Sequence, residues 1–520
     1  MRLGNRLFLF ALSFALILSL IGNASITHAQ PQSAISIYLD DNKINADVPP
    51  YIIPKLNVTM VPLSVISKNL GAGVSWSQST RTVTIRHEGT TLSMKIGQKF
   101  ALVNGTEVGL DATVQAINGR VMVPLRFVSK QMNLLVTWYQ SAQTIKLQTQ
   151  GGLTDMSLKG AWISTVYNLD WPSDKSYANS EQQRQEYIRL LDDLQGMGLN
   201  SVFVQVRPSA DSFYPSKLVP WSRFVTGKQG QAPDYDPLAF MIEETHRRGM
   251  EFHAWFNPFR ANTDAKTDNL ASNHVAIEHP DWIVKSGTLM YINPGIPEAR
   301  QHIIDVIIEV VNGYEIDGVH LDDYFYPSNG VFPDDATYTQ YNADPLLNKS
   351  DWRRDNINRF VEDLGKSIQQ AKPQVRFGIS PFGVWRNQEV DPTGSATKAG
   401  VTAYDNMYAD VRKWIKEEWI DYVAPQIYWS MTLKIAQYNT LVDWWTNEVR
   451  GTKVDLYIGH APYKLGTPEI GWNNAQEIID QLKYNQQYFE IKGDIFFSAQ
   501  HLRKNPLGLV PLLKAYYNAK

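Results

Sequence analysis

The sequence predicts an α/β chain with two folded regions, a small α+β domain built from two repeats and then a (β/α)8 TIM barrel over residues 158–520. Two observations predict the barrel. Eight apolar segments of strand length alternate with amphipathic helical patterns, and each segment ends in polar or aromatic residues. The length of 520 residues, which is too great for one ordinary domain, agrees with this division.

The eight predicted strands are short apolar runs bounded by turn residues. They span residues 160–166, 201–207, 251–259, 318–324, 376–381, 422–428, 454–460 and 494–498. Between the first two, a helical pattern places Tyr187, Leu190 and Leu194 on one face, with Ser180 as the predicted N-cap. A later helix is predicted to carry Pro297 in its first turn.

An open doubly wound sheet is the competing fold for alternating strands and helices. That fold usually carries a glycine-rich turn after its first strand. Here the corresponding segment, residues 166–171, is Val-Tyr-Asn-Leu-Asp-Trp and contains no glycine. The barrel is therefore favoured, and its functional residues are expected at the C-terminal ends of the strands.

The first segment, residues 1–29, is predicted to be a signal peptide. Arg2 and Arg6 precede an apolar run, and Ala29 supplies the small residue expected at a cleavage site. No later segment is long and apolar enough to cross a bilayer. We therefore expect an exported protein, secreted or associated with the cell wall.

An internal repeat occupies residues 30–149, at an offset of 62 residues. Val61-Pro-Leu and Val123-Pro-Leu begin matching units, each read as a short helix, a strand, a polar turn and a second strand. Asn104-Gly105 is a strong signal for a hairpin turn. The polar residues 150–157, with two adjacent glycines, form the predicted linker to the barrel.

Composition narrows the classes of function. The net charge is −3, from 49 basic and 52 acidic residues, so nothing indicates a nucleic-acid or anionic-membrane partner. The chain has no cysteine, which excludes disulfides, cysteine-based catalysis and a lipid-anchored cysteine after the signal peptide. Aromatic residues make up 12% of the chain, and many lie at predicted strand ends, where a core needs them less.

The end of the fourth predicted strand carries the clearest chemical signal. Val319 and Leu321 give it an apolar start, and it ends in Asp322, Asp323 and Tyr324. Carboxylates beside flat rings suit the hydrolysis of a sugar chain, because acids perform the chemistry and rings pack on pyranose faces. A capped strand end, with one aspartate starting a loop, is the structural alternative. If Leu321 packs against the helices, the period of two points Asp322 into the site.

The other strand ends supply polar and aromatic candidates for binding substrate. Any one of them can be a satisfied polar group in a core, but a core explains all eight ends together poorly. The predicted substrate-binding residues are Trp162, Gln205, Arg207, Trp255, Asn257, Arg260, His320, Tyr324, Gln426, Tyr428, Trp429, His460 and Tyr463.

Six motifs run along the predicted barrel: Gly160-Ala-Trp, Val204-Gln-Val-Arg-Pro, Ala254-Trp-Phe-Asn-Pro, Tyr291-Ile-Asn-Pro-Gly, Asp317-Gly-Val-His-Leu-Asp-Asp-Tyr and Tyr422-Val-Ala-Pro-Gln-Ile-Tyr-Trp. On these motifs, the chain from about residue 158 to 518 resembles the glycosyl-hydrolase-like family ten, exported bacterial barrels related to glycoside hydrolases. The resemblance implies hydrolysis of a glycosidic bond, with peptidoglycan glycan strands among the expected substrates.

The fourth-strand motif is also similar to that of the α-amylase superfamily, whose final aspartate is the nucleophile. By this analogy Asp322 is the predicted nucleophile or general base. The amylase pattern has a glutamate near the end of strand five, and this sequence lacks one there. The general acid must therefore come from a loop. Asp405 is the first choice, and the alternatives are Asp323, Glu389, Asp391 and Asp211.

The repeat region resembles the copper amine oxidase N-terminal-like domain of exported bacterial proteins. The two Val-Pro-Leu starts, the Val-x-Trp strands and the Thr-Val-Thr-Ile ending carry the match over about residues 35–149. A copper site would lack ligands, because His87 is the one histidine of this region. The resemblance implies a spacer or surface-attachment module, here called the stalk domain.

We therefore expect an exported, monomeric glycosidase that acts on a cell-wall polysaccharide, uses no cofactor or metal, and meets the wall surface through its stalk domain. Two glycan-directed alternatives stay open: a barrel that binds glycan without cutting it, and an α-glucan-type glycosidase. A metal-dependent hydrolase is a third reading, with His253, His320, Asp322 and His460 as ligands. These histidines are scattered single residues, which disfavours it.

Overall fold

The computed structural model describes residues 35–518, apart from 40–41, 55, 57, 88, 133, 140–143, 150–156, 178, 323–324 and 344–346. The predicted signal peptide, most of the predicted linker, and both Asp323 and Tyr324 thus lie outside the described residues. The chain divides into two compact units, residues 1–152 and 153–520. None of the described helices is long and apolar enough to cross a membrane.

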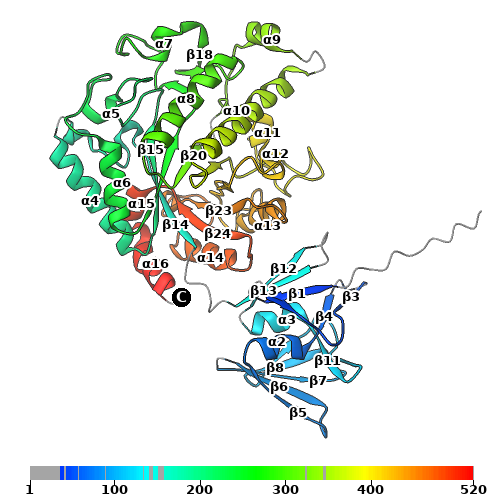
Figure 1. The fold of residues 1–520 in the computed structure, drawn as a ribbon. Coiled ribbons are helices and arrows are strands. Elements are labelled where there is room, and N and C mark those ends of the chain that lie inside the picture. The colour runs from blue at the N-terminus through cyan, green and yellow to red at the C-terminus, as the bar shows by residue number, and fades with distance from the viewer. Residues whose placement is uncertain are drawn as a thin grey trace, which may run out of the picture. The chain divides into compact units, whose positions relative to one another are not determined.

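Eight parallel strands close into the predicted (β/α)8 barrel (Figure 1). They are β14 (Leu158–Ile163), β15 (Ser201–Arg207), β16 (Glu251–Phe256), β20 (Gly318–Asp322), β21 (Arg376–Ser380), β22 (Tyr422–Val423), β23 (Asp455–His460) and β24 (Ile491–Phe496). Each lies at or near its predicted place. Strand β22 is much shorter than predicted, and beyond it Gln426 makes only isolated bridges to Phe382 and Gly459.

Helices follow the strands and surround the barrel (Figure 1). The longer ones are α4 (Ser180–Gly196), α6 (Pro237–Arg247), α8 (Pro297–Gly313), α10 (Lys349–Ala371), α13 (Tyr438–Val449), α14 (Gln476–Asn485) and α16 (Leu509–Asn518). The shorter ones are α5 (Arg223–Thr226), α7 (Val275–Glu278), α9 (Asp335–Tyr341), α11 (Ala403–Asn406), α12 (Val411–Lys416) and α15 (Ala499–Arg503). A small antiparallel sheet, formed by β17 (Arg260–Asn262), β18 (Ile283–Ser286) and β19 (Leu289–Ile292), follows β16.

Two predicted helix starts can be compared with the structure. Pro297 opens α8, as predicted. The N-cap of α4 is Asn179, whose side chain accepts the backbone N–H of Gln182 at 3.0 Å, so the prediction of Ser180 was one residue late. Both residue types cap helices well, and the sequence alone does not separate neighbours of this kind.

The barrel interior is filled by large rings, and inward-facing glycines make room for them. Tyr422 has no exposed surface, and a Cβ atom at Gly378 would collide with its ring. In the same way, a Cβ atom at Gly318 would collide with the imidazole of His253. Because each strand contributes one wall of a narrow barrel, a ring on one strand requires a small residue on its neighbour.

The stalk domain is an α+β unit whose two repeats meet at its centre. The first repeat contains β4 (Val58–Pro62), α2 (Leu63–Asn69), β5 (Gly73–Ser77) and β6 (Thr82–His87), and the second contains β11 (Arg120–Pro124), α3 (Leu125–Gln131), β12 (Leu134–Tyr139) and β13 (Thr144–Thr149). Strands β4 and β11 pair in antiparallel fashion, with Val61 opposite Val123. Apolar residues of both repeats form one core, so the units bury together what each alone would expose.

The remaining strands complete the sheets of the stalk domain. They are β1 (Ser36–Leu39), β2 (Asn42–Ile44), β3 (Tyr51–Ile53), β7 (Thr90–Lys95), β8 (Phe100–Val103), β9 (Thr106–Gly109) and β10 (Gln115–Ile117). The predicted hairpin lies between β8 and β9, where Asn104 and Gly105 both have positive φ. Strands β5 to β9 form a five-stranded sheet in which β5 is an edge strand.

Candidate active site

Strand β20 carries a carboxylate to the C-terminal mouth of the barrel. Val319 and Leu321 have no exposed surface and pack in the apolar layer of the barrel wall. His320, between them, contacts rings inside the barrel. Asp322 is the last residue of the strand and is partly exposed. The period of two therefore places its carboxylate on the inner side of the mouth.

Two side-chain amides hold the carboxylate of Asp322. Asn257, which follows β16, donates from Nδ2 to Oδ2 at 3.2 Å. Gln426, which follows β22, donates from Nε2 to Oδ1 at 3.1 Å and to the carbonyl of Ser380 at 3.2 Å. Each carboxylate oxygen thus has a donor from a different strand end, and the group is fixed in one orientation.

Backbone groups determine which atoms of this network donate hydrogen bonds and which accept them. The Oε1 atom of Gln205 accepts the N–H groups of Thr165 at 2.9 Å and of Val166 at 2.8 Å. Because backbone N–H groups only donate, the amide of Gln205 can face them in one way. Its Nε2 therefore donates to Oδ1 of Asn257, at 2.5 Å, which leaves the nitrogen of Asn257 for Asp322.

A second chain of hydrogen bonds runs inside the barrel. The indole N–H of Trp162 donates to Nε2 of His320 at 3.0 Å. Nδ1 of His320 and Nδ1 of His253 each lie 3.2 Å from the hydroxyl of Tyr422, and Nε2 of His253 lies 3.2 Å from Glu251. Burial, together with His253, holds the pKa of His320 well below its usual value. His320 is thus a neutral interior group that supports the mouth, which differs from its predicted role as a glycan contact.

The two arginines predicted to bind glycan lie in different surroundings. Arg207 has no exposed surface, and its Nη1 donates to the carbonyls of Asn257 at 2.7 Å and Pro258 at 3.0 Å. Burial lowers the pKa of Arg207 to about 10. It holds the end of β16, and this differs from the expected glycan contact because a fully buried side chain cannot touch a ligand. Arg260 is partly exposed, and the nearby charge of Asp322 partly offsets the lowering of its pKa by burial.

The predicted aromatic residues separate into an interior set and a mouth set. Trp162 and Trp255 are only 3% and 4% exposed and pack among the interior rings, a position that does not match their predicted role in substrate binding. Tyr428, Trp429 and Tyr463 are partly exposed. The rings of Tyr428 and Tyr463 meet edge to face, with 5.9 Å between their centroids. These three rings are the described aromatic residues of the predicted set that a ligand can reach.

The acids considered for proton donation are mostly engaged. Both carboxyl oxygens of Asp405 are bound by Arg386, at 2.9 Å and 3.0 Å, and the same guanidinium lies 3.3 Å from Asp391. Glu389 is an exposed partner of a lysine. Asp211 is buried, which raises its pKa to about 6. Because Arg386 binds both of its carboxyl oxygens, a donor role for Asp405 would require this ion pair to open.

His460 lies in the layer between the barrel and its helices. Its Nδ1 is 2.9 Å from Gln481 of α14, and its Nε2 is 2.8 Å from Asp494. It shares a strand face with Leu456 and Ile458, which pack in the outer apolar layer. The expected role in substrate binding therefore does not match its position. In the described part of the chain, no group of three or more histidine, cysteine, aspartate or glutamate side chains could hold a metal ion.

Two residues outside the predicted set shape the same mouth. Tyr167, after β14, is 59% exposed and has a φ of 56°, a backbone region that non-glycine residues seldom occupy. Asp170 accepts hydrogen bonds from Ser498 at 2.7 Å and from the N–H of Ser164 at 2.8 Å, and so joins the ends of the first and last strands. Sequence patterns do not reveal that Tyr167 has a left-handed backbone conformation. An aspartate such as Asp170, just after a strand end, is a detectable signal of a functional site.

Comparison with protein families gives two matches. The model described as glycosyl hydrolase-like 10 matches residues 157–477. The model described as copper amine oxidase N-terminal domain matches residues 38–147. The first covers more than half of the chain, and both agree with the resemblances on which the sequence analysis relied.

Individual relatives carry similar names. Glycosyl hydrolase YngK of Bacillus subtilis (strain 168) is 53% identical over 361 residues, covering 68% of this chain and 71% of that protein. Glycosyl hydrolase DigH of Escherichia coli (strain K12) is 41% identical over 370 residues, covering 67% of this chain and 84% of that protein. The solved glycoside hydrolase domain of PgaB (BpsB) from Bordetella bronchiseptica has a TM-score of 0.48 and 13% identity, over 69% of this chain and 99% of that one.

Proposed function

The chain belongs to the glycosyl hydrolase-like 10 family, and on that premise we propose that it hydrolyses glycosidic bonds in a cell-wall polysaccharide, with peptidoglycan glycan strands as the substrate. One observation carries the proposal: the carboxylate of Asp322 stands at the barrel mouth with an amide donor on each oxygen. A fixed carboxylate in this place is suited to act on an anomeric carbon, as nucleophile or as general base.

The reaction needs a second carboxyl group as proton donor. The bond between the anomeric carbon and the glycosidic oxygen breaks, and the donor's proton goes to the leaving oxygen. Water supplies the hydroxyl that ends on the anomeric carbon, and its remaining proton restores the donor. Asp323 is the neighbour of Asp322 in sequence, and Asp405 would first have to leave Arg386. Asp323 and Asp405 are the proposed donors, and substituting each in turn shows which of them the reaction requires.

Substrate contacts are proposed for the exposed part of the mouth. Tyr428, Trp429 and Tyr463 offer ring faces to the C–H faces of sugars. Arg260 is partly exposed near Asp322 and is suited to an acidic group on a sugar, such as the lactyl carboxylate of a wall sugar. The stalk domain would hold a monomeric, exported enzyme at the wall, in keeping with the predicted signal peptide.

The deciding experiment compares products from purified glycan strands by mass spectrometry. We expect Asp322→Asn to lower the rate by several powers of ten, because loss of one catalytic carboxylate commonly does so. Asp480→Asn is the matched control, since Asp480 is an exposed acid on α14 whose side chain is bound by Gln476. Unchanged turnover in a folded Asp322→Asn protein would refute the assignment. Cleavage of α-glucans in preference to wall glycans would favour the α-glucan alternative.

A glycan-binding barrel without catalysis is the second candidate. Two observations favour it. Strand β21 ends in Ser380 and supplies no acid, and Asp405, the first choice for the proton donor, forms an ion pair with Arg386. If the wild-type protein binds oligosaccharides and releases no product, this second candidate holds. Loss of binding in Trp429→Ala together with absent cleavage would then place the binding function at the same mouth.

A further inference from the structure

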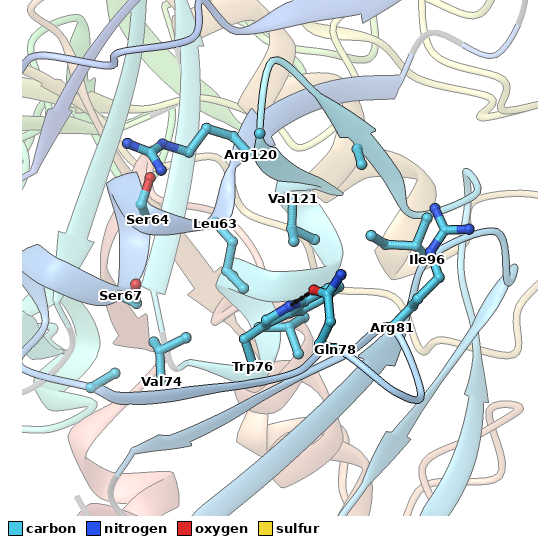
Figure 2. A pocket seen from close by; sticks show the side chains of 14 residues that line it. Leu63, Ser64, Ser67, Val74, Trp76, Gln78, Arg81, Ile96, Arg120 and Val121 are labelled. Atoms are coloured by element: carbon cyan, nitrogen blue, oxygen red, sulfur yellow. Dashed lines mark hydrogen bonds between the residues drawn. The ribbon is translucent and has the colours of Figure 1, made fainter.

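The stalk domain contains a hollow of about 630 Å³, between α2 and the edge strand β5 (Figure 2). Small-molecule sites usually measure about 300–1,000 Å³. The lining mixes apolar side chains with hydroxyl, amide and guanidinium groups, among them Trp76, Ser64, Ser67, Gln78, Arg81 and Arg120. A cavity of this size and mixture fits a sugar unit better than an ion or a purely apolar ligand.

Strand pairing explains why an indole is exposed here. Trp76 lies opposite Val83, which is 3% exposed in the core. Both residues thus share the core-facing side of the sheet, yet Trp76 is 44% exposed and Val74, two residues earlier, is 48% exposed. Strand β5 is an edge strand, and its core-facing side extends past the packed core to form the floor of the hollow.

The indole is held in a fixed orientation. Its Nε1–H donates to Oε1 of Gln78 at 2.8 Å, a bond drawn in Figure 2. Because this bond occupies the polar edge of Trp76, the ring faces are what the side chain offers to a ligand. Flat aromatic faces pack against apolar C–H surfaces, and the two faces of a pyranose ring are such surfaces.

The charged side chains that line the hollow are all positive. Its lining contains Arg81 and Arg120 and no carboxylate. Figure 2 shows the two arginines on opposite sides of the opening. Arg120 pairs with Asp47, outside the lining, whereas Arg81 makes no ion pair with any described residue. Guanidinium groups bind carboxylates through two parallel hydrogen bonds, so Arg81 is placed for an acidic ligand.

We propose that this hollow binds a carboxylate-bearing sugar unit of an acidic polysaccharide. Trp76 packs on the sugar ring, Arg81 pairs with its carboxylate, and Ser64 meets a hydroxyl group. The site makes the stalk domain a second glycan-binding module, whose action does not depend on catalysis in the barrel.

The test follows the indole of Trp76 in the full chain labelled with 5-fluorotryptophan. Trp76→Phe identifies its fluorine signal. Two oligosaccharides of equal length are compared, one with alternating N-acetylmuramic acid and N-acetylglucosamine, and one with N-acetylglucosamine alone, which lacks the lactyl carboxylate. We expect the acidic ligand to shift the Trp76 signal at lower concentration. Arg81→Gln should weaken this response about two- to fivefold, and added salt should weaken it further.

Matched variants separate binding from general effects. Leu102→Ala removes an equally exposed apolar side chain of the same sheet, and Lys99→Gln removes an exposed cation outside the lining. Neither should change the response. A Trp76 signal that neither ligand shifts, or that both shift equally with no effect of Arg81→Gln, overturns the proposal. The signal reports on the stalk domain alone. If the wild-type protein shows the shift but releases no product from glycan strands, this site is upheld while glycan hydrolysis by the barrel is refuted.

Discussion

The barrel and the stalk domain both expose aromatic residues, but they differ in what surrounds those rings. At the barrel mouth, Tyr428 and Trp429 accompany Asp322, a carboxylate fixed by amides from two strand ends. In the hollow of the stalk domain, Trp76 is accompanied by two arginines and no acid. Rings suffice for holding a sugar, whereas cleavage requires a positioned carboxylate, so the comparison separates the proposed place for chemistry from the proposed place for binding.

Among the variants that test this difference, Gln205→Glu should have the largest effect, because it breaks the amide network that holds Asp322. The new carboxylate still accepts the N–H groups of Thr165 and Val166, but it cannot donate to Asn257, whose amide should then turn away from Asp322. We expect kcat to fall about 10- to 100-fold, since misplacement of a catalytic group costs this much. Steady-state kinetics on soluble oligosaccharides measures the change.

Gln183→Glu is the control for Gln205→Glu. Gln183 is an equally buried amide on α4, and its Nε2 is bound by two backbone carbonyls. A similar fall in kcat for both variants would mean that a buried charge, rather than the amide network, is responsible. Full activity of Gln205→Glu would contradict the role of the network.

The second test concerns acid stability of the barrel. Burial, and then Arg207, lower the pKa of His302 to about 4, while an unfolded histidine has a pKa near 6.5. Since the folded pKa is depressed, this histidine contributes stability above pH 6.5 that is lost as the pH falls toward 4. Between pH 7.5 and 5, the wild type should lose about 2 kcal/mol more than His302→Gln in its free energy of unfolding.

Denaturant unfolding of both proteins at several pH values measures that loss. Burial lowers the pKa of His274 to about 4 in the same unit, so a pH dependence should persist in the variant. The stalk domain has one histidine, His87, over residues 35–149, and its unfolding should respond less in this range. Identical pH dependence of the wild type and His302→Gln would contradict the prediction.

A smaller effect is expected for Trp429→Ala. If Trp429 packs on one sugar of a long chain, its loss should weaken binding of an octasaccharide about fivefold and leave a disaccharide nearly unaffected. Calorimetry with an Asp322→Asn background avoids cleavage of the ligand. Equal losses for both ligands, or none, would mean that Trp429 packs at the barrel rim and does not line an extended cleft.

The smallest effect on rate is expected for removal of the stalk domain. A chain that starts near Gly152 should cleave soluble fragments at the full-length rate, because the two units are separately compact and all the proposed catalytic acids lie in the barrel. It should bind intact walls less well, as a sedimentation assay would show. An insoluble or inactive barrel would reveal that the two units depend on each other.

The fold was predictable because its signals are local and repeated. Strand β20 shows this: Val319 and Leu321 pack outward and Asp322 reaches the mouth, as alternation predicts. The same rule would have placed His460 outward with Leu456 and Ile458, had it been applied to that strand. The two-repeat architecture likewise followed from the 62-residue offset, since each unit forms the same elements.

The candidate site was less predictable, because depth within a barrel leaves no mark on a single strand. Trp162 and Trp255 alternate correctly toward the inside, but they lie below the mouth among other rings. Arg207 follows an irregularity in the pairing of β15 with β16, which interrupts the alternation after Gln205. Such features depend on neighbouring strands, whose register a sequence does not state.

The pairing of interior rings with glycines constrains how this barrel can change. The ring of Tyr422 fills the space beside Gly378, and the imidazole of His253 fills the space beside Gly318. A larger residue at either glycine should be tolerated only when the ring on the next strand shrinks, so the two positions are expected to show strong epistasis. A mutational library that varies single sites would find only losses there. A library that varies both partners together would find the compensated pairs, and with them the routes by which relatives of this barrel can diverge.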